Sequence, residues 1–121
     1  MNKLTYQLPW ILVMFLLSLQ SVSTSINLPT SATDGSDKVV HFLAYGVLGF
    51  TLVRGFEVLL KRYVVWSLII GVVYSGLSEW IQSYIPGRSA SLSDLIANVL
   101  GVIVCVLFWW NMATIRNKNE I

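Results

Sequence analysis

Residues 38–53 read KVVHFLAYGVLGFTLV and place a lysine and a histidine inside a run that is otherwise apolar enough to lie in lipid. The sequence EWIQ at residues 79–82 creates the same conflict in a second apolar segment. A charge at the centre of a bilayer costs at least about 2.5 kcal/mol, so such groups usually face partners or water rather than lipid. These stretches therefore predict membrane-spanning helices that carry a polar cluster.

The composition supports a membrane protein. Of the 121 residues, 55% are hydrophobic and 12% are charged, and the mean hydropathy is +0.70. A soluble domain usually has about 25% charged residues. A net charge of +2 without a basic cluster argues against nucleic acid as a partner. At this length we expect one domain, residues 1–121.

Four apolar segments predict an all-α bundle of transmembrane helices, because a spanning helix needs about 20 residues. The expected helices cover about residues 8–24, 38–56, 63–84 and 92–112. The first segment follows Lys3 and also resembles a signal peptide, but it has no clean cleavage site, so we expect it to be retained. Pro86-Gly87 predicts a tight turn between the last two helices.

The basic residues predict the orientation of the bundle. In a four-span arrangement Lys38 and Arg88 fall on one side and the other six lysines and arginines fall on the opposite side. Those six are Lys3, Arg54, Lys61, Arg62, Arg116 and Lys118. The positive-inside rule then places both termini in the cytoplasm.

This topology brings polar residues from distant parts of the chain to one membrane level, near the outer surface. The residues are Asp37, Lys38, His41, Tyr45, Glu79, Gln82, Arg88, Asp94 and Asn98. His41 and Tyr45 are four residues apart, as are Asp94 and Asn98, so each pair shares one face of its helix. We therefore expect a buried network in which the cations and the anions nearly balance.

Several roles are open for this cluster. His41 and Glu79 are the candidate proton-transfer pair, and Lys38 and Arg88 are the candidate contacts for phosphate or carboxylate groups. The other members would orient a ligand by hydrogen bonds: Asp37, Tyr45, Gln82, Asp94 and Asn98. Asp94 also fits the first turn of a helix capped by Ser91.

Other kinds of site receive little support from the sequence. One histidine and dispersed carboxylates do not give a zinc spacing, so no metal or other cofactor is expected. Serines between Ser89 and Ser93 leave a Ser-His-Asp triad open, but no nucleophile elbow accompanies them. Small residues between Gly46 and Gly101 indicate close helix packing.

The polar positions also form a pattern of their own. The pattern is Asp37-Lys38-x-x-His41-Phe42-x-x-Tyr45, Glu79-x-x-Gln82, Pro86-Gly87-Arg88 and Asp94-x-x-x-Asn98-x-x-Gly101. It resembles the VanZ-like family of small bacterial membrane proteins, whose founding member is linked to low-level teicoplanin resistance. The resemblance implies a multi-pass protein of the bacterial cytoplasmic membrane, with these polar positions as its signature. It implies no catalytic assignment.

Two functions are favoured by these observations. One is an outward-facing site for an envelope amphiphile, namely a lipid headgroup, a lipid-linked wall intermediate or a lipoglycopeptide. The alternative is a scaffold or accessory subunit whose polar cluster only holds the helices together. A proton-coupled transporter is a third reading, although four spans leave little room for alternating access. Membrane lipids are the expected partners.

Overall fold

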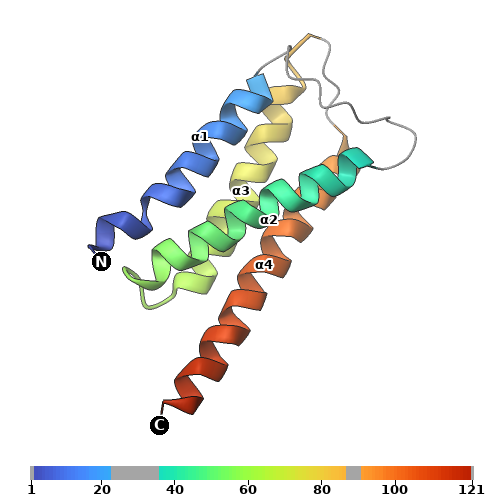
Figure 1. Ribbon diagram of the computed structural model, residues 1–121. Helices are drawn as coiled ribbons and strands as arrows, with labels where there is room; N and C mark the ends of the chain where they lie inside the picture. Colours follow the sequence, from blue (N-terminus) through green and yellow to red (C-terminus); the bar gives the residue numbers. More distant parts are fainter. Residues whose placement is uncertain (1, 23–35, 87–90, 121) are drawn as a thin grey trace.

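The computed structural model describes residues 2–22, 36–86 and 91–120, and the side chains of Ser36 and Asp37 lie outside this description. A short 3-10 helix, η1 (Lys3–Tyr6), precedes α1 (Leu8–Val22). Three longer helices follow: α2 (Ser36–Glu57), α3 (Tyr63–Gln82) and α4 (Leu92–Asn119). The described residues contain no β-strand, as Figure 1 shows.

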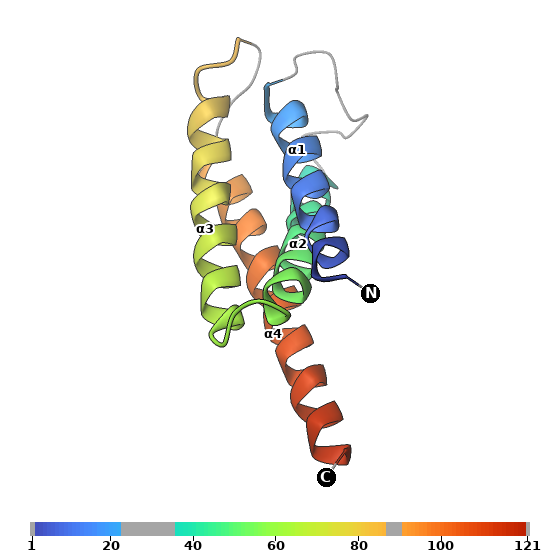
Figure 2. The same ribbon diagram turned by 90° about the vertical axis from the view of Figure 1, so that its left-hand side faces the viewer.

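The helices alternate in direction. The start of α2, the end of α3 and the start of α4 lie at one end of the bundle (Figures 1 and 2). Four segments are long and apolar enough to cross a membrane: Lys3–Val22, Lys38–Glu57, Tyr63–Gln82 and Leu92–Asn119. The predicted bundle of four apolar helices is therefore confirmed.

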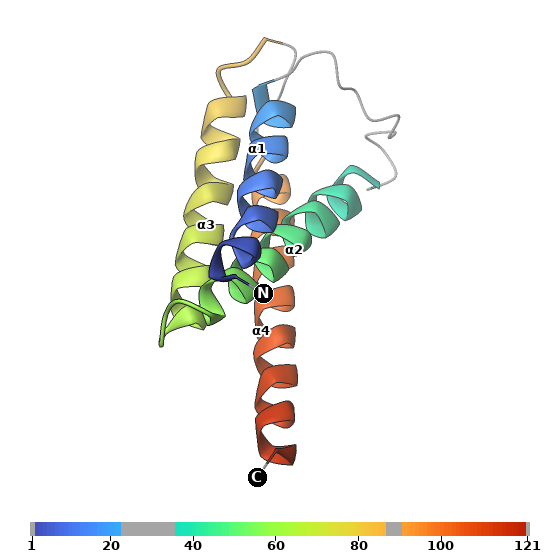
Figure 3. The same ribbon diagram turned by 60° about the vertical axis from the view of Figure 1, so that its left-hand side comes forward.

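The last helix is longer than the sequence pattern predicted. We expected it to end near residue 112, whereas α4 continues to Asn119 and projects beyond the other helices (Figure 3). Its 28 residues span about 42 Å at 1.5 Å per residue, which exceeds a hydrocarbon core of about 30 Å. Arg116 and Lys118 in its last turn complement the helix dipole. The fall in hydropathy marks the end of the apolar layer and not the end of the helix.

The start of α4 agrees with the expected cap. Ser91 has an extended backbone and its Oγ accepts a hydrogen bond from the backbone N–H of Asp94 at 3.0 Å. This bond satisfies one of the free amides at the helix N-terminus and fixes the first turn. The orientation of Asp94 towards its partners depends on that turn.

The core lies where α2, α3 and α4 meet. The side chains of Leu48, Leu52, Val53, Val102 and Val106 are fully buried there. Large apolar side chains remain exposed on every helix, and α1 exposes Ile11, Leu12, Phe15 and other apolar residues along its length. A molecule with this outer surface is suited to lipid rather than to water.

Glycines allow α2 and α4 to approach each other closely. A Cβ added at Gly101 would collide with the carbonyl oxygen of Phe42, and one at Gly49 would lie 2.8 Å from the carbonyl oxygen of Val102. On the other side of α4, a Cβ at Gly71 of α3 would lie 2.5 Å from Val102 Cγ1. Small residues of this kind bring helix backbones together in membranes, where no hydrophobic force acts between helices. The predicted packing role of Gly49, Gly71 and Gly101 is confirmed.

The first helix joins the bundle through specific polar contacts. Gln7 Nε2 donates to the Gly55 carbonyl oxygen at 2.8 Å, and the Tyr74 hydroxyl of α3 donates to the Met14 carbonyl oxygen at 2.9 Å. Gly55 also lies against the indole of Trp10, where a Cβ would approach Cδ1 to 2.6 Å. These contacts hold α1 against α2 and α3.

Replacing Gly101 with alanine should destabilise the bundle by about 1–3 kcal/mol, because the added methyl overpacks the crossing with α2. Gly76→Ala is the matched control, since no atom lies within 4 Å of its added Cβ. Alanine is the better helix former, so Gly76→Ala should leave stability unchanged or raise it. Thermal unfolding of both variants in detergent measures the difference, and equal unfolding temperatures would contradict the tight crossing.

Candidate functional site

A chain of polar side chains crosses three helices near the start of α4. Lys38 Nζ of α2 lies 2.8 Å from Asp94 Oδ1 of α4. One turn along both helices, His41 Nδ1 lies 2.9 Å from Asn98 Oδ1. Asn98 Nδ2 then donates to Glu79 Oε1 of α3 at 3.3 Å. Three segments that are distant in sequence are thus linked side chain to side chain.

The direction of these hydrogen bonds assigns the histidine proton. Asn98 uses its amide nitrogen towards the Glu79 carboxylate, so its carbonyl oxygen faces the imidazole and accepts from His41 Nδ1. The other ring nitrogen, Nε2, lies 4.0 Å from Asp94 Oδ2. Asp94 therefore faces both the Lys38 ammonium group and the second ring nitrogen of His41.

The residues of this chain of contacts differ in burial, and the most exposed side chain is that of Lys38. The Lys38 side chain is 39% exposed, whereas those of His41 and Asp94 are 18% and 13% exposed. Asn98 is fully buried and Glu79 is 6% exposed. The site thus runs from an accessible ammonium group to a carboxylate in the interior of the bundle.

Glu79 is only half satisfied. Its Oε1 accepts from Asn98, whereas Oε2 is buried and meets no donor in hydrogen-bond geometry among the described residues, although the backbone of Ser91 lies close to the carboxyl group. A buried carboxylate oxygen without a donor is costly in a protein interior, where polar groups are nearly always paired. This oxygen is the strongest indication within the described part of the chain that a further group belongs at the site.

Tyr45 and Gln82 lie near the chain of contacts but bond elsewhere. Tyr45 is 3% exposed and its ring stacks on Tyr74, with 6.1 Å between centroids, as part of the core. Gln82 is 5% exposed and donates from Nε2 to Ser21 Oγ of α1 at 3.3 Å. Both residues support the walls of the site, and neither forms a hydrogen bond to His41 or Glu79 in the described structure.

Two expected site residues cannot be placed in this geometry. Arg88 lies outside the described residues, as does the side chain of Asp37, although Asp37 itself belongs to α2. The glycine of the expected Pro86-Gly87 turn also falls outside them. The roles expected for Asp37 and Arg88 therefore stay predictions.

The sequence analysis missed the contribution of α1. Ser21 is 3% exposed and meets Gln82, and Ser18 Oγ lies 2.7 Å from the Tyr74 hydroxyl. Serines at this spacing near the end of an apolar segment carry no distinctive signal. Only their contacts with polar groups of α3 reveal them.

The chemistry available here is that of hydrogen bonding and charge. Asn98 stands between His41 and Glu79, so a proton can pass between these two groups only through a molecule that bridges them. Among the described residues no group of three or more His, Cys, Asp and Glu side chains is positioned to hold a metal ion.

Comparison with known proteins gives the family. The model of the VanZ/LLP1 family matches residues 3–115. The chain belongs to the VanZ/LLP1 family. An uncharacterized protein of Schizosaccharomyces pombe is 32% identical over 73 residues, which cover 60% of this chain and 45% of the relative. The chain thus spans less than half the length of this relative.

The comparisons also limit what membership implies. No solved structure matches this VanZ/LLP1 protein. The fission-yeast relative means that the expected bacterial origin and the link to teicoplanin resistance do not follow from similarity. What is established is a VanZ/LLP1 membrane protein with four apolar helices.

Replacing Asn98 with leucine should destabilise this VanZ/LLP1 protein by about 2–4 kcal/mol, because the change leaves a buried carboxylate and an imidazole nitrogen without partners. Ser93→Leu is the control, since Ser93 is exposed on the same helix end. Thermal unfolding in detergent measures both variants. An unchanged unfolding temperature for Asn98→Leu would show that the polar chain does not hold the helices together.

Proposed function

We propose that this VanZ/LLP1 protein binds the polar headgroup of a membrane amphiphile at the cluster formed by Lys38, His41, Glu79, Asp94 and Asn98. The ligand supplies a hydroxyl or amino group to Glu79 and an anionic group to Lys38. The fungal relative favours a headgroup that bacterial and eukaryotic membranes share over one restricted to cell-wall synthesis.

The observation that carries this proposal is the difference between two carboxylates of the same molecule. Glu57 of α2 uses both oxygens: Trp109 Nε1 donates to Oε2 at 2.9 Å, and Arg116 donates to Oε1 at 3.3 Å. Glu79 is more deeply buried and uses only Oε1. A carboxylate kept only for packing would be expected to resemble Glu57. The missing donor at Glu79 Oε2 favours a site in which a ligand supplies that hydrogen bond.

The gradient of exposure supports the same assignment. Lys38 is accessible enough to meet a headgroup phosphate or carboxylate, and its ion pair with Asp94 holds the ammonium group in position. His41 lies between the accessible and the buried ends of the cluster, within reach of Asp94. Arg88 and Asp37 are proposed to extend the charged rim, while Tyr45 and Gln82 shape the wall.

The orientation expected from the basic residues makes this an extracytoplasmic site. Wall intermediates and lipoglycopeptides would be encountered on that side of a bacterial membrane, and outer-leaflet lipids in any membrane. The proposal assigns binding to the cluster. A reaction would require the ligand itself to bridge His41 and Glu79.

The central test replaces Glu79 with glutamine, which keeps the size of the side chain and the acceptor towards Asn98. The amphiphile retained at this cluster after purification should fall about tenfold or more, because a hydrogen bond to a charged group contributes about 1.5 kcal/mol or more. Mass spectrometry of the purified protein measures bound lipid per protein. Unfolding temperature and membrane abundance should stay close to those of the wild type.

Glu57→Gln is the matched control, since it removes a carboxylate from the other end of α2. It should leave the lipid bound near the Glu79 end unchanged. The single variant His41→Ala should also lower the amount of amphiphile retained at the cluster, as Glu79→Gln does. If Glu79→Gln instead lowers abundance and stability while the bound lipids are unchanged, the cluster only holds the helices together. The hydrogen bonds between α2, α3 and α4 give that scaffold role its physical basis.

The proposed orientation can be tested by cysteine labelling in a variant whose single native cysteine, Cys105, is replaced by alanine. Ser93→Cys lies at the site end of α4, and Asn119→Cys lies at its opposite end, and both positions are exposed. An impermeant maleimide should label Ser93→Cys in intact bacterial cells and Asn119→Cys only after permeabilisation. The reverse pattern would place the cluster on the cytoplasmic side.

A further inference from the structure

A second cluster of interacting side chains lies at the opposite end of α2 and α4, and its centre is Arg54. The guanidinium carbon of Arg54 lies 5.2 Å from the ring centroid of Trp109 and 5.8 Å from those of Tyr6 and Phe50. Rings from η1, α2 and α4 therefore hold one cation by cation–π contact. Arg54 is nevertheless exposed.

The neighbouring arginine differs in its partners. Arg116 also lies over Trp109, at 5.5 Å, but it donates to Glu57 at 3.3 Å. Arg54 has no carboxylate within ion-pair distance in the described structure, and its recorded contacts there are with aromatic rings. Its donors are thus oriented by the rings and left available for an anion, since ring faces occupy the cation without using its N–H groups.

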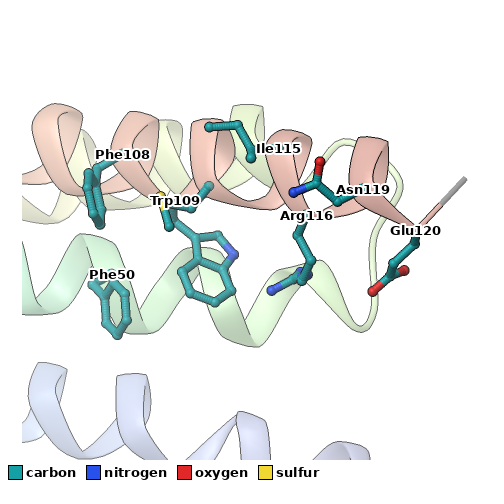
Figure 4. A pocket seen from close by; sticks show the side chains of 8 residues that line it. Phe50, Phe108, Trp109, Ile115, Arg116, Asn119 and Glu120 are labelled. Carbon is teal, nitrogen blue, oxygen red and sulfur yellow. The ribbon is translucent and has the colours of Figure 1, made fainter.

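Two hollows flank this arginine. The larger is an open groove of about 650 Å³, lined mainly by side chains of α4, including Phe108, Met112 and Ile115, together with Phe50 of α2. The smaller encloses about 100 Å³ between η1, α1 and α2 and includes Arg54 itself in its wall. Phe50 belongs to both walls. Figure 4 shows the Trp109 ring and the Arg116 side chain extending from α4 towards α2 at the larger hollow.

The acidic groups nearby do not cancel this charge. Glu57 is engaged by Trp109 and Arg116, and Glu120 lies at the far end of the larger hollow, at the end of α4. Lys61 and Arg62 are exposed in the α2–α3 connection at the same end of the bundle. The local charge therefore favours an anion at Arg54.

We propose that this end of the protein binds one anionic phospholipid, with its phosphate on Arg54 and an acyl chain in the hollow between Phe50, Phe108 and Met112. A phospholipid joins an anionic group to an apolar chain, which is the combination that an available guanidinium beside an apolar hollow recognises. Guanidinium groups bind phosphate oxygens through paired hydrogen bonds. Tryptophan is enriched at the depth of lipid headgroups, where Trp109 would place this site. The site is separate from the Glu79 cluster and does not depend on the function proposed for it.

The test compares dioleoyl phosphatidylglycerol with dioleoyl phosphatidylcholine added to the purified full chain in detergent. These lipids have the same acyl chains and differ in headgroup charge. Binding is measured by native mass spectrometry and by the rise in unfolding temperature. The wild type should prefer the anionic lipid, and Arg54→Gln should weaken that binding about fivefold or more, as expected for the loss of one cation beside an anionic headgroup.

The controls separate this site from general charge attraction. Arg62→Gln removes an exposed cation from the same end and should change binding far less than Arg54→Gln. Arg54→Lys keeps the charge and should retain much of the preference, which shows that the effect does not come from misfolding. Inorganic phosphate and glycerol 3-phosphate test whether the headgroup alone is sufficient.

Several results would overturn the proposal. Equal binding of the two lipids by the wild type would remove the anionic preference. An equal loss in Arg62→Gln and Arg54→Gln would reduce the effect to net surface charge. Stabilisation by inorganic phosphate equal to that by the lipid would show a phosphate site without an acyl-chain component. Unchanged retention in Glu79→Gln alongside loss in Arg54→Gln would leave this proposal intact while contradicting the other.

Discussion

The close approach of α2 and α4 at Gly101 is the constraint on which both ends of the molecule depend. A backbone contact between Gly101 and the Phe42 carbonyl fixes the register of two helices that run in the same direction. Towards the start of both helices, Lys38 pairs with Asp94, 56 residues away in sequence, and His41 pairs with Asn98, 57 residues away. On the other side of the crossing, Glu57 accepts a hydrogen bond from Trp109, which is 52 residues away in sequence. The two helices run in the same direction and touch along their length, so a shift at the crossing would displace every one of these contacts.

Hydropathy was sufficient to predict the number and order of the helices, whereas the membrane orientation expected from the basic residues stays a prediction. The sequence also predicted the Ser91 cap, because an N-cap serine followed by an acid in the first turn has a local chemical signature. It failed at the C-terminal end of α4, where polar residues such as Arg116 and Asn117 follow the apolar run. Polar side chains are compatible with a helix that leaves the bilayer, so composition indicates where the lipid ends and cannot indicate where the helix ends.

The sequence predicted the level along the helices at which the polar residues lie, but it did not predict how each helix is rotated about its own axis. The spacing within each helix predicted that nine polar residues lie at one level, and the Lys38–Asp94 and His41–Asn98–Glu79 contacts confirm this convergence for five of them. The same spacing could not tell that Tyr45 turns to Tyr74 or that Gln82 turns to Ser21 of α1. Which neighbour a side chain meets depends on the rotation of each helix about its axis. That rotation is set by the glycine contacts between helices, which a single sequence does not display.

The two ends of the α2–α4 pair handle their charges in opposite ways. At the Arg116 end the carboxylate is complete, because Glu57 has donors on both oxygens, and the available group is the Arg54 cation. At the Lys38 end the cation is paired with Asp94, and the incomplete group is the Glu79 carboxylate. Lipid cannot solvate either charge, so each end needs a partner that water or another molecule provides. Arg54 is exposed, so a lipid headgroup at the surface can pair with its charge. Glu79 is buried, so a donor to its carboxylate has to enter between the helices. This difference in depth is the physical reason why we propose a surface lipid site at the Arg54 end and a more selective site at the Glu79 end.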